Sequence, residues 1–406
     1  MKWAFTQKAA AFAVTALLAT TALAQDKPLK IGAIIPNTGG MAVLGNDLGN
    51  WYEIAVQQRN ANGGLLGRKI ELVRGDAVNP QEAIAAVERL VGREGTEIVI
   101  GTIASSLSQA ASEAALSNNV LFWETGSLAK DLTERGLPNF VRSGPSTVNF
   151  AKTAADAVLN MLAGELGKAP KDLKVWMEHE SSNYGTSLAE EQQRVLKEAG
   201  VKVERLGHAA SAVDLTDSIL RAKKFNPDIW LISGYVGDTH LLLRTAREQG
   251  FAPSAVILVG LGDSRETVEA IGQDYLQGIL VVTYPRHEVN SSYARGADEL
   301  SALYVEKYRQ QPVGNSGFGG YVGLNILFNA IEAAKTTKWE AVVAAAKTLD
   351  APVGTFANGY GVHFDDKMQN TRANPIVYQW QGDKTVAVFP DVARKEGVKL
   401  KSLARP

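Results

Sequence analysis

The chain has 406 residues, and its 42 Lys and Arg against 43 Asp and Glu leave a formal net charge of −1 at pH 7. This balance provides no basic field of the kind that nucleic acid or an anionic membrane surface requires, so we expect neither as a partner. The sequence contains no cysteine, which excludes disulfides, cysteine–zinc sites, cysteine nucleophiles and the lipid-modified start of a lipoprotein.

Residues 1–24 have the pattern of a cleavable signal peptide. Lys2 and Lys8 make this segment positive at its start, and residues 9–23 form an apolar run. The run is about fifteen residues long, whereas a membrane anchor needs about 20. The small residues Ala22 and Ala24 suit a cleavage site, so the sequence predicts an exported protein that begins at Gln25. The remainder is too long for one hydrophobic core and predicts two domains.

Strands and helices alternate beyond the leader. The first series has strands at 30–35, 70–73, 97–100, 119–123 and 139–142, a polar loop at 37–40, and helices at 47–60, 80–93 and 105–117. Gly63 and Gly64 can adopt positive φ angles at little cost, so they end the first helix and reverse the chain. This order predicts an α/β fold.

A second α/β series follows near residue 147. Its expected strands are 173–179, 201–207, 228–233 and 255–260, and its expected helices are 147–165, 184–199, 214–225 and 238–249. The unbroken apolar run at 229–232 is typical of a parallel strand that is covered on both faces. Helices at 292–309 and 320–334 come next, and the segments 376–380 and 385–389 predict a terminal hairpin-like pair.

This ordered set of motifs, with the glycine elbow at 60–76, resembles the leucine/isoleucine/valine-binding protein family of type I periplasmic solute-binding proteins. The resemblance extends from about residue 30 to about residue 380 and implies two Rossmann-like lobes with parallel sheets, joined by a three-strand hinge. The implied lobes comprise residues 25–143 plus 279–350 and residues 144–278 plus 351–406. The chain is expected to cross between them near 143–145, 278–284 and 351–356. Such a hinge allows the lobes to close on a ligand.

The resemblance also implies the partners of the protein. Members of the family deliver a small solute to an ABC permease in the inner membrane, so we expect a monomeric periplasmic protein without a cofactor. The solute expected from the resemblance is an amino acid of the branched-chain type.

Two loops are expected to hold the carboxylate of the ligand. Ser105 and Ser106 stand between a strand end and a helix start, where serine commonly acts as an N-cap. Free N–H groups and the helix dipole at such a position also attract an anion. The resemblance implies that this serine pair binds an α-carboxylate, with Ser106 as the leading residue, and that Thr125, Gly126 and Ser127 complete the pocket. The second loop is one residue shorter than is usual in the family.

Three aromatic residues are candidates for contact with the ligand. Tyr184 opens a second-lobe helix and resembles the family's ligand-covering tyrosine, although a tyrosine can equally pack under its own helix. Tyr235 follows the strand at 228–233 and matches a second cleft aromatic. Phe318 resembles an aromatic that packs on the ligand side chain, and its alternative is a place in the core.

Recognition of an amine is where the sequence departs from the family. The family usually has a glutamate after the strand that here ends at Gly260, and Gly262 occupies its place. Asp263 is one candidate replacement, but it can also cap the helix that follows. Glu124 is the other, because it follows a strand end where an unpaired carboxylate would be costly.

The main hypothesis is therefore an importer's binding protein for a small carboxylate-bearing solute. The alternatives are the same fold with an aromatic acid, an amide or a urea-like compound as ligand, or a sensor of the same fold. The sequence does not predict an enzyme: its five histidines make no HExxH motif, and it has neither a GxSxG elbow nor a Walker A loop. It likewise predicts no metal site.

Overall fold

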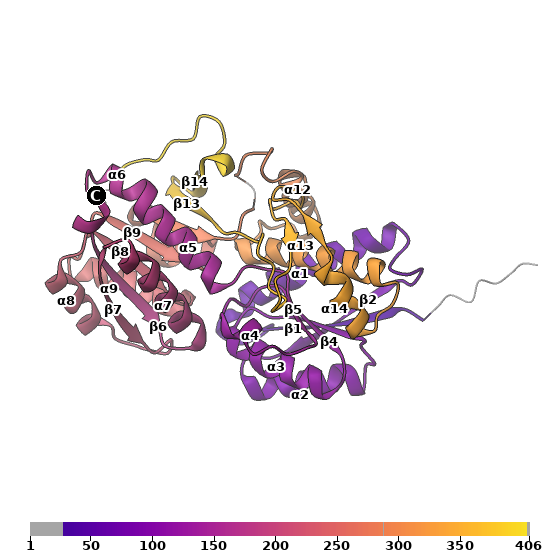
Figure 1. Ribbon diagram of the computed structural model, residues 1–406. Helices are drawn as coiled ribbons and strands as arrows, with labels where there is room; N and C mark the ends of the chain where they lie inside the picture. Colours follow the sequence, from indigo (N-terminus) through magenta and orange to yellow (C-terminus); the bar gives the residue numbers. More distant parts are fainter. Residues whose placement is uncertain (1–26, 287, 404–406) are drawn as a thin grey trace, which may run out of the picture.

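The strands form two main sheets in the computed structural model, which describes residues 27–286 and 288–403. The sheets lie in two lobes that stand side by side, each with helices on both faces of its sheet (Figure 1). The predicted signal peptide at 1–24 lies outside the described residues. Within the described part of the chain, no helix combines the length and the apolar character needed to cross a membrane.

The first sheet is entirely parallel, with strand order β2-β1-β3-β4-β5. Its strands are β1 (Leu29–Ile35), β2 (Ile70–Asp76), β3 (Ile98–Gly101), β4 (Leu121–Glu124) and β5 (Phe140–Arg142). Helices α2 (Pro80–Gly92) and α3 (Ser105–Ser117) cover one face, and α1 (Ala42–Ala61), α13 (Asn315–Ala334) and α14 (Trp339–Lys347) cover the other; α4 (Asp131–Glu134) precedes β5. Successive strand residues serve opposite faces: Val99 and Phe122 pack under α2 and α3, while Ile100 and Trp123 pack on the other side. Both faces are thus buried, which explains the unbroken apolar runs.

The second sheet has seven strands in the order β14-β13-β10-β9-β8-β6-β7. They are β6 (Lys174–Glu180), β7 (Lys202–His208), β8 (Ile229–Ser233), β9 (Ala255–Val259), β10 (Leu280–Thr283), β13 (Ile376–Gln381) and β14 (Lys384–Phe389). The first five are parallel, and the terminal pair β13–β14 is antiparallel, as the sequence predicts.

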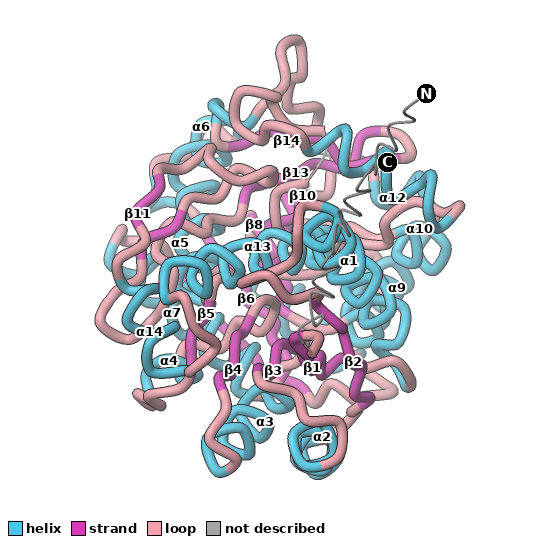
Figure 2. Tube along the Cα trace, turned by 90° about the vertical axis from the view of Figure 1, so that its right-hand side faces the viewer, coloured by secondary structure: helices cyan, strands magenta, loops and turns pink. Residues whose placement is uncertain are grey.

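Helices cover this second sheet as well. They are α5 (Thr147–Ala157), which continues through a π-helical turn (Val158–Leu162) into α6 (Ala163–Glu165), then α7 (Asn183–Glu198), α8 (Thr216–Phe225), α9 (Val236–Glu248), α10 (Arg265–Ile271) and α11 (Gln273–Leu276). Figure 2 shows the same layering at right angles to the first view. Helix α12 (Ala297–Tyr308) and the short pair β11 (Asp350–Ala351) and β12 (Val362–His363) belong to the connections near the first lobe.

The lobe boundaries differ in detail from the sequence expectation. The second segment of the expected first lobe began at residue 279, but β10 pairs with β9 and β13 in the second sheet. All four residues of β10 are buried, so this strand needs a neighbour on each side, and the chain leaves the sheet only after Thr283. Conversely, part of the segment expected in the second lobe reaches the first, because Phe364 packs against Trp123 with ring centroids 5.9 Å apart.

Candidate functional site

A narrow cavity lies where loops of both lobes meet at the carboxyl ends of the parallel strands. It is lined by Ile103, Gly126, Leu128, Tyr184, Tyr235, Gly260, Leu261, Tyr284 and Ser316. Most of these residues directly follow β3, β4, β6, β8, β9 or β10, which is the edge at which open α/β sheets bind ligands. The cavity holds about 30 Å³, room for little more than water, so a larger solute needs the lobes to move apart.

The first turn of α3 carries the two predicted serines, Ser105 and Ser106, near this edge of the sheet. The N-cap position is Ala104, whose side chain cannot cap the helix, and the predicted capping role of the serines is therefore wrong. Ser105 is buried and its Oγ accepts a hydrogen bond from the N–H of Ala129 at 3.1 Å. Ser106 is partly exposed and its hydroxyl makes no hydrogen bond within the described residues. A hydroxyl beside free N–H groups of the first turn is suited to an anion.

Glu124 shapes the second loop from inside the protein. Its fully buried carboxylate accepts hydrogen bonds from the backbone N–H groups of Thr102 (2.9 Å), Thr125 (2.8 Å), Gly126 (2.7 Å) and Ser127 (2.8 Å). The hydroxyl of Ser108 donates to it as well. One carboxylate therefore ties together the ends of β3 and β4, the start of α3 and the loop at 125–127.

Burial raises the pKa of Glu124 to about 7, while the hydrogen bonds from Ser108, Ser127 and Gly126 and the charge of Arg142 act to lower it. The carboxylate has no oxygen left for a ligand, and it does not line the cavity. Glu124 therefore holds the loops after β3 and β4 in position by hydrogen bonds.

The loop at 125–127 turns its side chains inward. Thr125 pairs with the hydroxyl of Tyr52 at 2.5 Å, and Ser127 pairs with the hydroxyl of Thr102 at 2.7 Å. Only Gly126 lines the cavity, and a Cβ there would lie 2.4 Å from the carbonyl oxygen of Thr102. The loop thus offers its backbone to the cavity, and glycine is required for the close approach of the two loops.

Three tyrosines wall the cavity. Tyr184 donates its hydroxyl to the carbonyl of Val259 at 3.0 Å, and its ring lies 5.5 Å from that of Tyr235. Tyr284 donates its hydroxyl to the carbonyl of Gly126 at 2.7 Å and so joins the end of the second sheet to the first lobe. Since the hydroxyl groups of Tyr184 and Tyr284 are engaged within the protein and that of Tyr235 pairs with Ser182, these tyrosines contribute mainly their rings to the cavity.

The other sequence candidates are not among the lining residues of this cavity; they include Ser105, Ser106, Thr125 and Ser127. Phe318 is 1% exposed and packs against Trp51 with ring centroids 4.9 Å apart, which is the core alternative. Asp263 is buried and accepts a hydrogen bond from Thr283 at 3.3 Å. The cap of α10 is Ser264 rather than Asp263, because the Ser264 side chain accepts from the N–H of Thr267. Neither Asp263 nor Glu124 lies among the lining residues, and neither does any other charged side chain.

A buried ionic cluster lies beside the cavity in the second lobe. His208, at the end of β7, is held between Glu178 on β6 (Nδ1–Oε1, 3.2 Å) and Asp238 in the first turn of α9 (Nε2–Oδ2, 2.9 Å). Burial acts to lower the pKa of His208, but its hydrogen bonds to Asp238 and Glu178 raise it to about 9. The imidazole is thus a cation at neutral pH that neutralises one of the two carboxylates.

The His208 cluster predicts a loss of stability at alkaline pH. The ordinary histidine pKa in an unfolded chain is about 6.5, so only the folded state keeps the proton as the pH rises from about 6.5 to about 9. Its stabilising contribution is complete below that range and is lost across it, by at most about 3 kcal/mol at roughly 1.4 kcal/mol per pKa unit. We expect the free energy of unfolding in urea to fall across this range more steeply in the wild type than in His208→Gln. Equal slopes would contradict the prediction.

Comparison with known proteins identifies the family of the chain. The family model described as periplasmic binding protein matches residues 28–385. The chain belongs to this periplasmic binding protein family. The Leu/Ile/Val-binding protein homolog 7 of Brucella suis biovar 1 is 36% identical over 392 residues, which cover 96% of this chain and 98% of that protein. Homolog 8 of Brucella abortus is 35% identical and covers 94% of each chain.

Solved structures confirm the fold of this periplasmic binding protein. A leucine-binding protein of Thermotoga maritima matches with a TM-score of 0.76 at 24% identity, covering 91% of this chain and 100% of that one. A branched-chain amino acid transporter substrate-binding protein of Streptococcus pneumoniae, solved with isoleucine, matches with a TM-score of 0.73 at 20% identity over 89% and 100%. A solute-binding protein of Rhodopseudomonas palustris, solved with 3,4-dihydroxybenzoic acid, gives 0.73 at 19% identity over 94% and 99%. The predicted two-lobe α/β fold is confirmed.

Sequence reasoning missed part of the cavity wall of this binding protein. Ile103, Leu128, Leu261, Tyr284 and Ser316 line the cavity but carry no polar motif that would single them out. Tyr284 was recognisable only as the end of a crossing segment. Its position directly after β10 is the same strand-end signal that selected Tyr235, and it could have been found once β10 was assigned to the second sheet.

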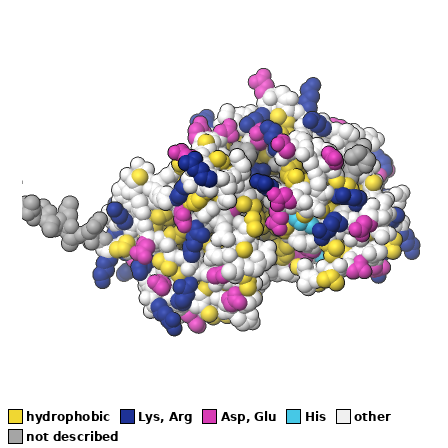
Figure 3. Space-filling model, turned by 180° about the vertical axis from the view of Figure 1, so that it is seen from behind, with side chains coloured by type: hydrophobic (Ala, Val, Ile, Leu, Met, Phe, Trp, Pro, Cys, Tyr) yellow, Lys and Arg dark blue, Asp and Glu magenta, His cyan; other side chains and the backbone are white. Residues whose placement is uncertain are grey.

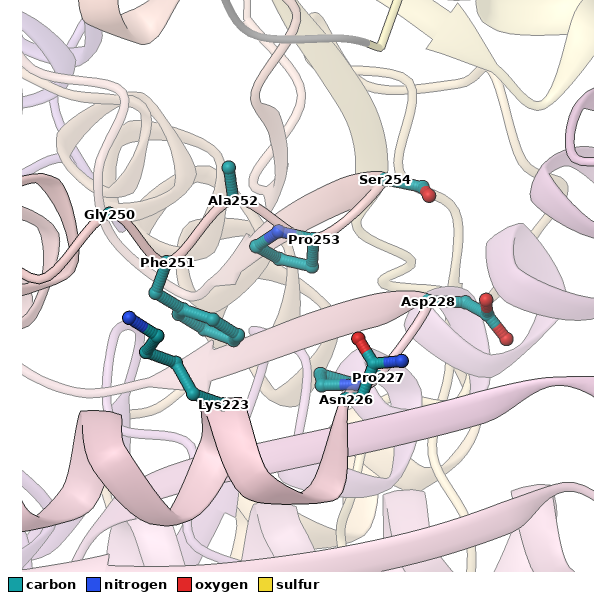
Figure 4. Close-up of a pocket in the computed structure, with 9 residues that line it drawn as sticks. All are labelled: Lys223, Asn226, Pro227, Asp228, Gly250, Phe251, Ala252, Pro253 and Ser254. Atoms are coloured by element: carbon teal, nitrogen blue, oxygen red, sulfur yellow. The ribbon is translucent and has the colours of Figure 1, made fainter.

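A larger pocket lies at the opposite edge of the second lobe from the tyrosine-walled cavity. It has a volume of about 310 Å³, and Figure 4 shows Lys223, Asp228, Phe251 and Ser254 around it. Asp228 and Ser254 directly precede β8 and β9, so this pocket lies at the amino ends of the strands. Only second-lobe residues line it, so lobe closure cannot act on a molecule bound there.

Proposed function

We propose that this protein is the solute-binding component of an ABC importer and that it captures an amino acid of the branched-chain type. The observation that carries the proposal is the apolar, tyrosine-walled cavity between two lobes, whose lining residue Ile103 precedes the unpaired Ser106 hydroxyl at the start of α3 by three residues. The names of the Brucella relatives as Leu/Ile/Val-binding protein homologs support this solute class.

In this proposal the ligand carboxylate meets the Ser106 hydroxyl and the first N–H groups of α3, beside the backbone of Gly126. The rings of Tyr184 and Tyr235 pack on its apolar part. Contacts from both lobes exist only in the closed form, so the ligand shifts the population toward closure by its differential affinity. The permease in the inner membrane then recognises the closed form.

Binding rather than catalysis accounts for the geometry, and the relatives are named as binding proteins. We propose that the protein reaches the periplasm through cleavage of the signal peptide at 1–24, without a lipid anchor, and acts there as a monomer.

Replacing Ser106 with Ala is expected to weaken the binding of L-leucine about tenfold or more, because a hydrogen bond to a charged group is worth roughly 1.5–3 kcal/mol. The measurement is calorimetric titration of the purified protein after unfolding and refolding to remove bound solute. Ser117→Ala is the matched control, since Ser117 is at the far end of the same helix and bonds only the carbonyl of Glu113. Affinity that is unchanged in Ser106→Ala contradicts the assigned pocket.

A solute panel tests the proposed function itself. Branched-chain and aromatic amino acids, aromatic acids, amides and urea are compared by thermal shift. A ligand at 1,000 times its Kd adds about 4 kcal/mol of stability, which is easily seen. Stabilisation by an aromatic acid or urea, with none by any amino acid, would overturn the amino-acid assignment.

A further inference from the structure

A second chamber of about 300 Å³ adjoins the tyrosine-walled cavity. Thr38, Gly40 and Met41 line it from the connection between β1 and α1 in the first lobe, and Gly237 and Asp238 line it from the first turn of α9 in the second. Tyr235 lines both spaces, so the two are neighbours across one aromatic ring. Because walls of the chamber come from both lobes, a group bound in it would be enclosed by closure.

Asp238 is the charged residue among those lining this chamber. It is 2% exposed; its Oδ2 bonds Nε2 of His208 at 2.9 Å, while its Oδ1 is buried and has no hydrogen-bond partner in the described structure. A buried carboxylate oxygen without a donor is costly. Asp238 stands in the first turn of α9. The geometry therefore leaves an acceptor that only a group from outside the protein can satisfy.

Two acidic side chains share one imidazole beside the chamber. His208 is shared by Glu178 and Asp238, so one cation serves two carboxylates, and Trp176 adds only a neutral N–H to Glu178. The nearby cation Arg205 lies 3.7 Å from Glu190 and is paired there. Figure 3 shows acidic and basic side chains interspersed over one face of the molecule.

We propose that Asp238 binds a cationic nitrogen of the transported solute through its free Oδ1. The proposal rests on the proposed function and extends it, because the tyrosine-walled cavity has no charged side chain and Gly262 stands where the family has its glutamate. The cationic nitrogen is either the α-ammonium of an amino acid or a distal ammonium on its side chain. If Asp238 binds the α-ammonium, the binding of every amino acid depends on it. If it binds a distal ammonium, only amino acids with a cationic side chain depend on it.

The test is calorimetric titration of the wild type and Asp238→Asn with L-leucine, L-lysine and 4-methylpentanoate, which is leucine without its ammonium group. We expect Asp238→Asn to weaken the binding of an amine-bearing ligand about 10- to 100-fold and to leave 4-methylpentanoate within about twofold. Loss for leucine and lysine alike assigns the α-ammonium, and loss for lysine alone assigns the distal one. Asp217→Asn, at an exposed aspartate of α8 in the same lobe, is the matched control.

A second pair of variants leaves Glu178, His208 and Asp238 unsubstituted. Gly40 lies across the chamber on the first lobe, and an added Cβ there meets no atom within 4 Å. Gly40→Lys brings a competing cation toward Asp238, and Gly40→Gln is its neutral counterpart. We expect the lysine variant alone to weaken the amine-bearing ligand about tenfold.

Two results would overturn the inference. Binding of leucine and lysine that is unchanged in Asp238→Asn excludes the contact, and equal losses for all three ligands show a structural role for Asp238. A wild type that binds neither amino acid rejects the proposed function together with this inference. Unchanged binding by Asp238→Asn beside a leucine-binding wild type rejects the inference alone.

Discussion

Replacing Glu124 with Ala is expected to lower the free energy of unfolding by roughly 4 kcal/mol, among the largest losses that a single substitution causes. The carboxylate accepts from four backbone N–H groups and the Ser108 hydroxyl, all in the interior of the first lobe. The substitution leaves these donors without a partner, and each buried unsatisfied donor costs about 1–3 kcal/mol before water or local rearrangement relieves it. Urea unfolding followed by circular dichroism measures the change.

Two further variants complete the experiment: one removes only the charge of Glu124, and the other is a control at an exposed glutamate. Glu124→Gln keeps one carbonyl acceptor, so we expect a loss of roughly half as much. Glu113→Ala removes an exposed glutamate from α3 and should change stability by no more than about 0.5 kcal/mol. A loss below about 1 kcal/mol in Glu124→Ala would show that the loops keep their shape without this acceptor.

Replacing Arg142 with Met is expected to cost about 3 kcal/mol. The buried guanidinium donates to Gln369 Oε1 (2.5 Å), to the carbonyls of Ala129 (2.7 Å) and Ser127 (3.3 Å), and to Thr133. Burial lowers the pKa of Arg142 to about 10, and the charge of Glu124 acts to raise it. The substitution leaves these buried acceptors without a donor, and each buried unsatisfied group costs about 1–3 kcal/mol before water or local rearrangement relieves it.

The Arg142 prediction also concerns the connection between the lobes. The backbone N–H of Arg142 donates to Met368 and its carbonyl accepts from Asn370, so β5 is joined to the segment that leads into β13. Urea unfolding of Arg142→Met is compared with Arg221→Met, an exposed arginine on α8. A double-mutant cycle with Glu124→Gln measures the coupling of the two charges, and strictly additive losses would argue against it.

Much of the fold was predictable because its signals are local. The glycine elbow, the apolar strand runs and the turn before the terminal pair all depend on near neighbours in the chain, and the strands appear where these patterns predict them. The lobe boundary was predicted wrongly because it depends on strand pairing and not on a local pattern. Leu280–Thr283 has the same apolar pattern whichever sheet it joins, and its sheet is decided by its pairing with β9 on one side and with the distant strand β13 on the other.

The candidate site was predictable as a set of loops but not as a set of side chains. The resemblance to the family selected Gly126, Tyr184 and Tyr235 in loops beyond strand ends, and these residues do line the cavity. It equally selected Ser105 and Thr125, whose hydroxyl groups are engaged with Ala129 and Tyr52 instead. Spacing along the chain gives the position of a loop, whereas the direction of each side chain depends on the partner it meets.

The sequence by itself determined that this is an α/β protein with its functional loops at the carboxyl ends of the strands, because periodicity and glycine turns are properties of short segments. Only the tertiary structure decided which acidic side chains keep a carboxylate oxygen without a hydrogen-bond donor. Glu124 is fully engaged by donors from Thr102, Ser108 and its own loop, while Asp238 meets His208 with one oxygen and keeps the other free. The physical reason is that the availability of a buried carboxylate depends on how many donors distant segments bring to it, and no local pattern encodes that number.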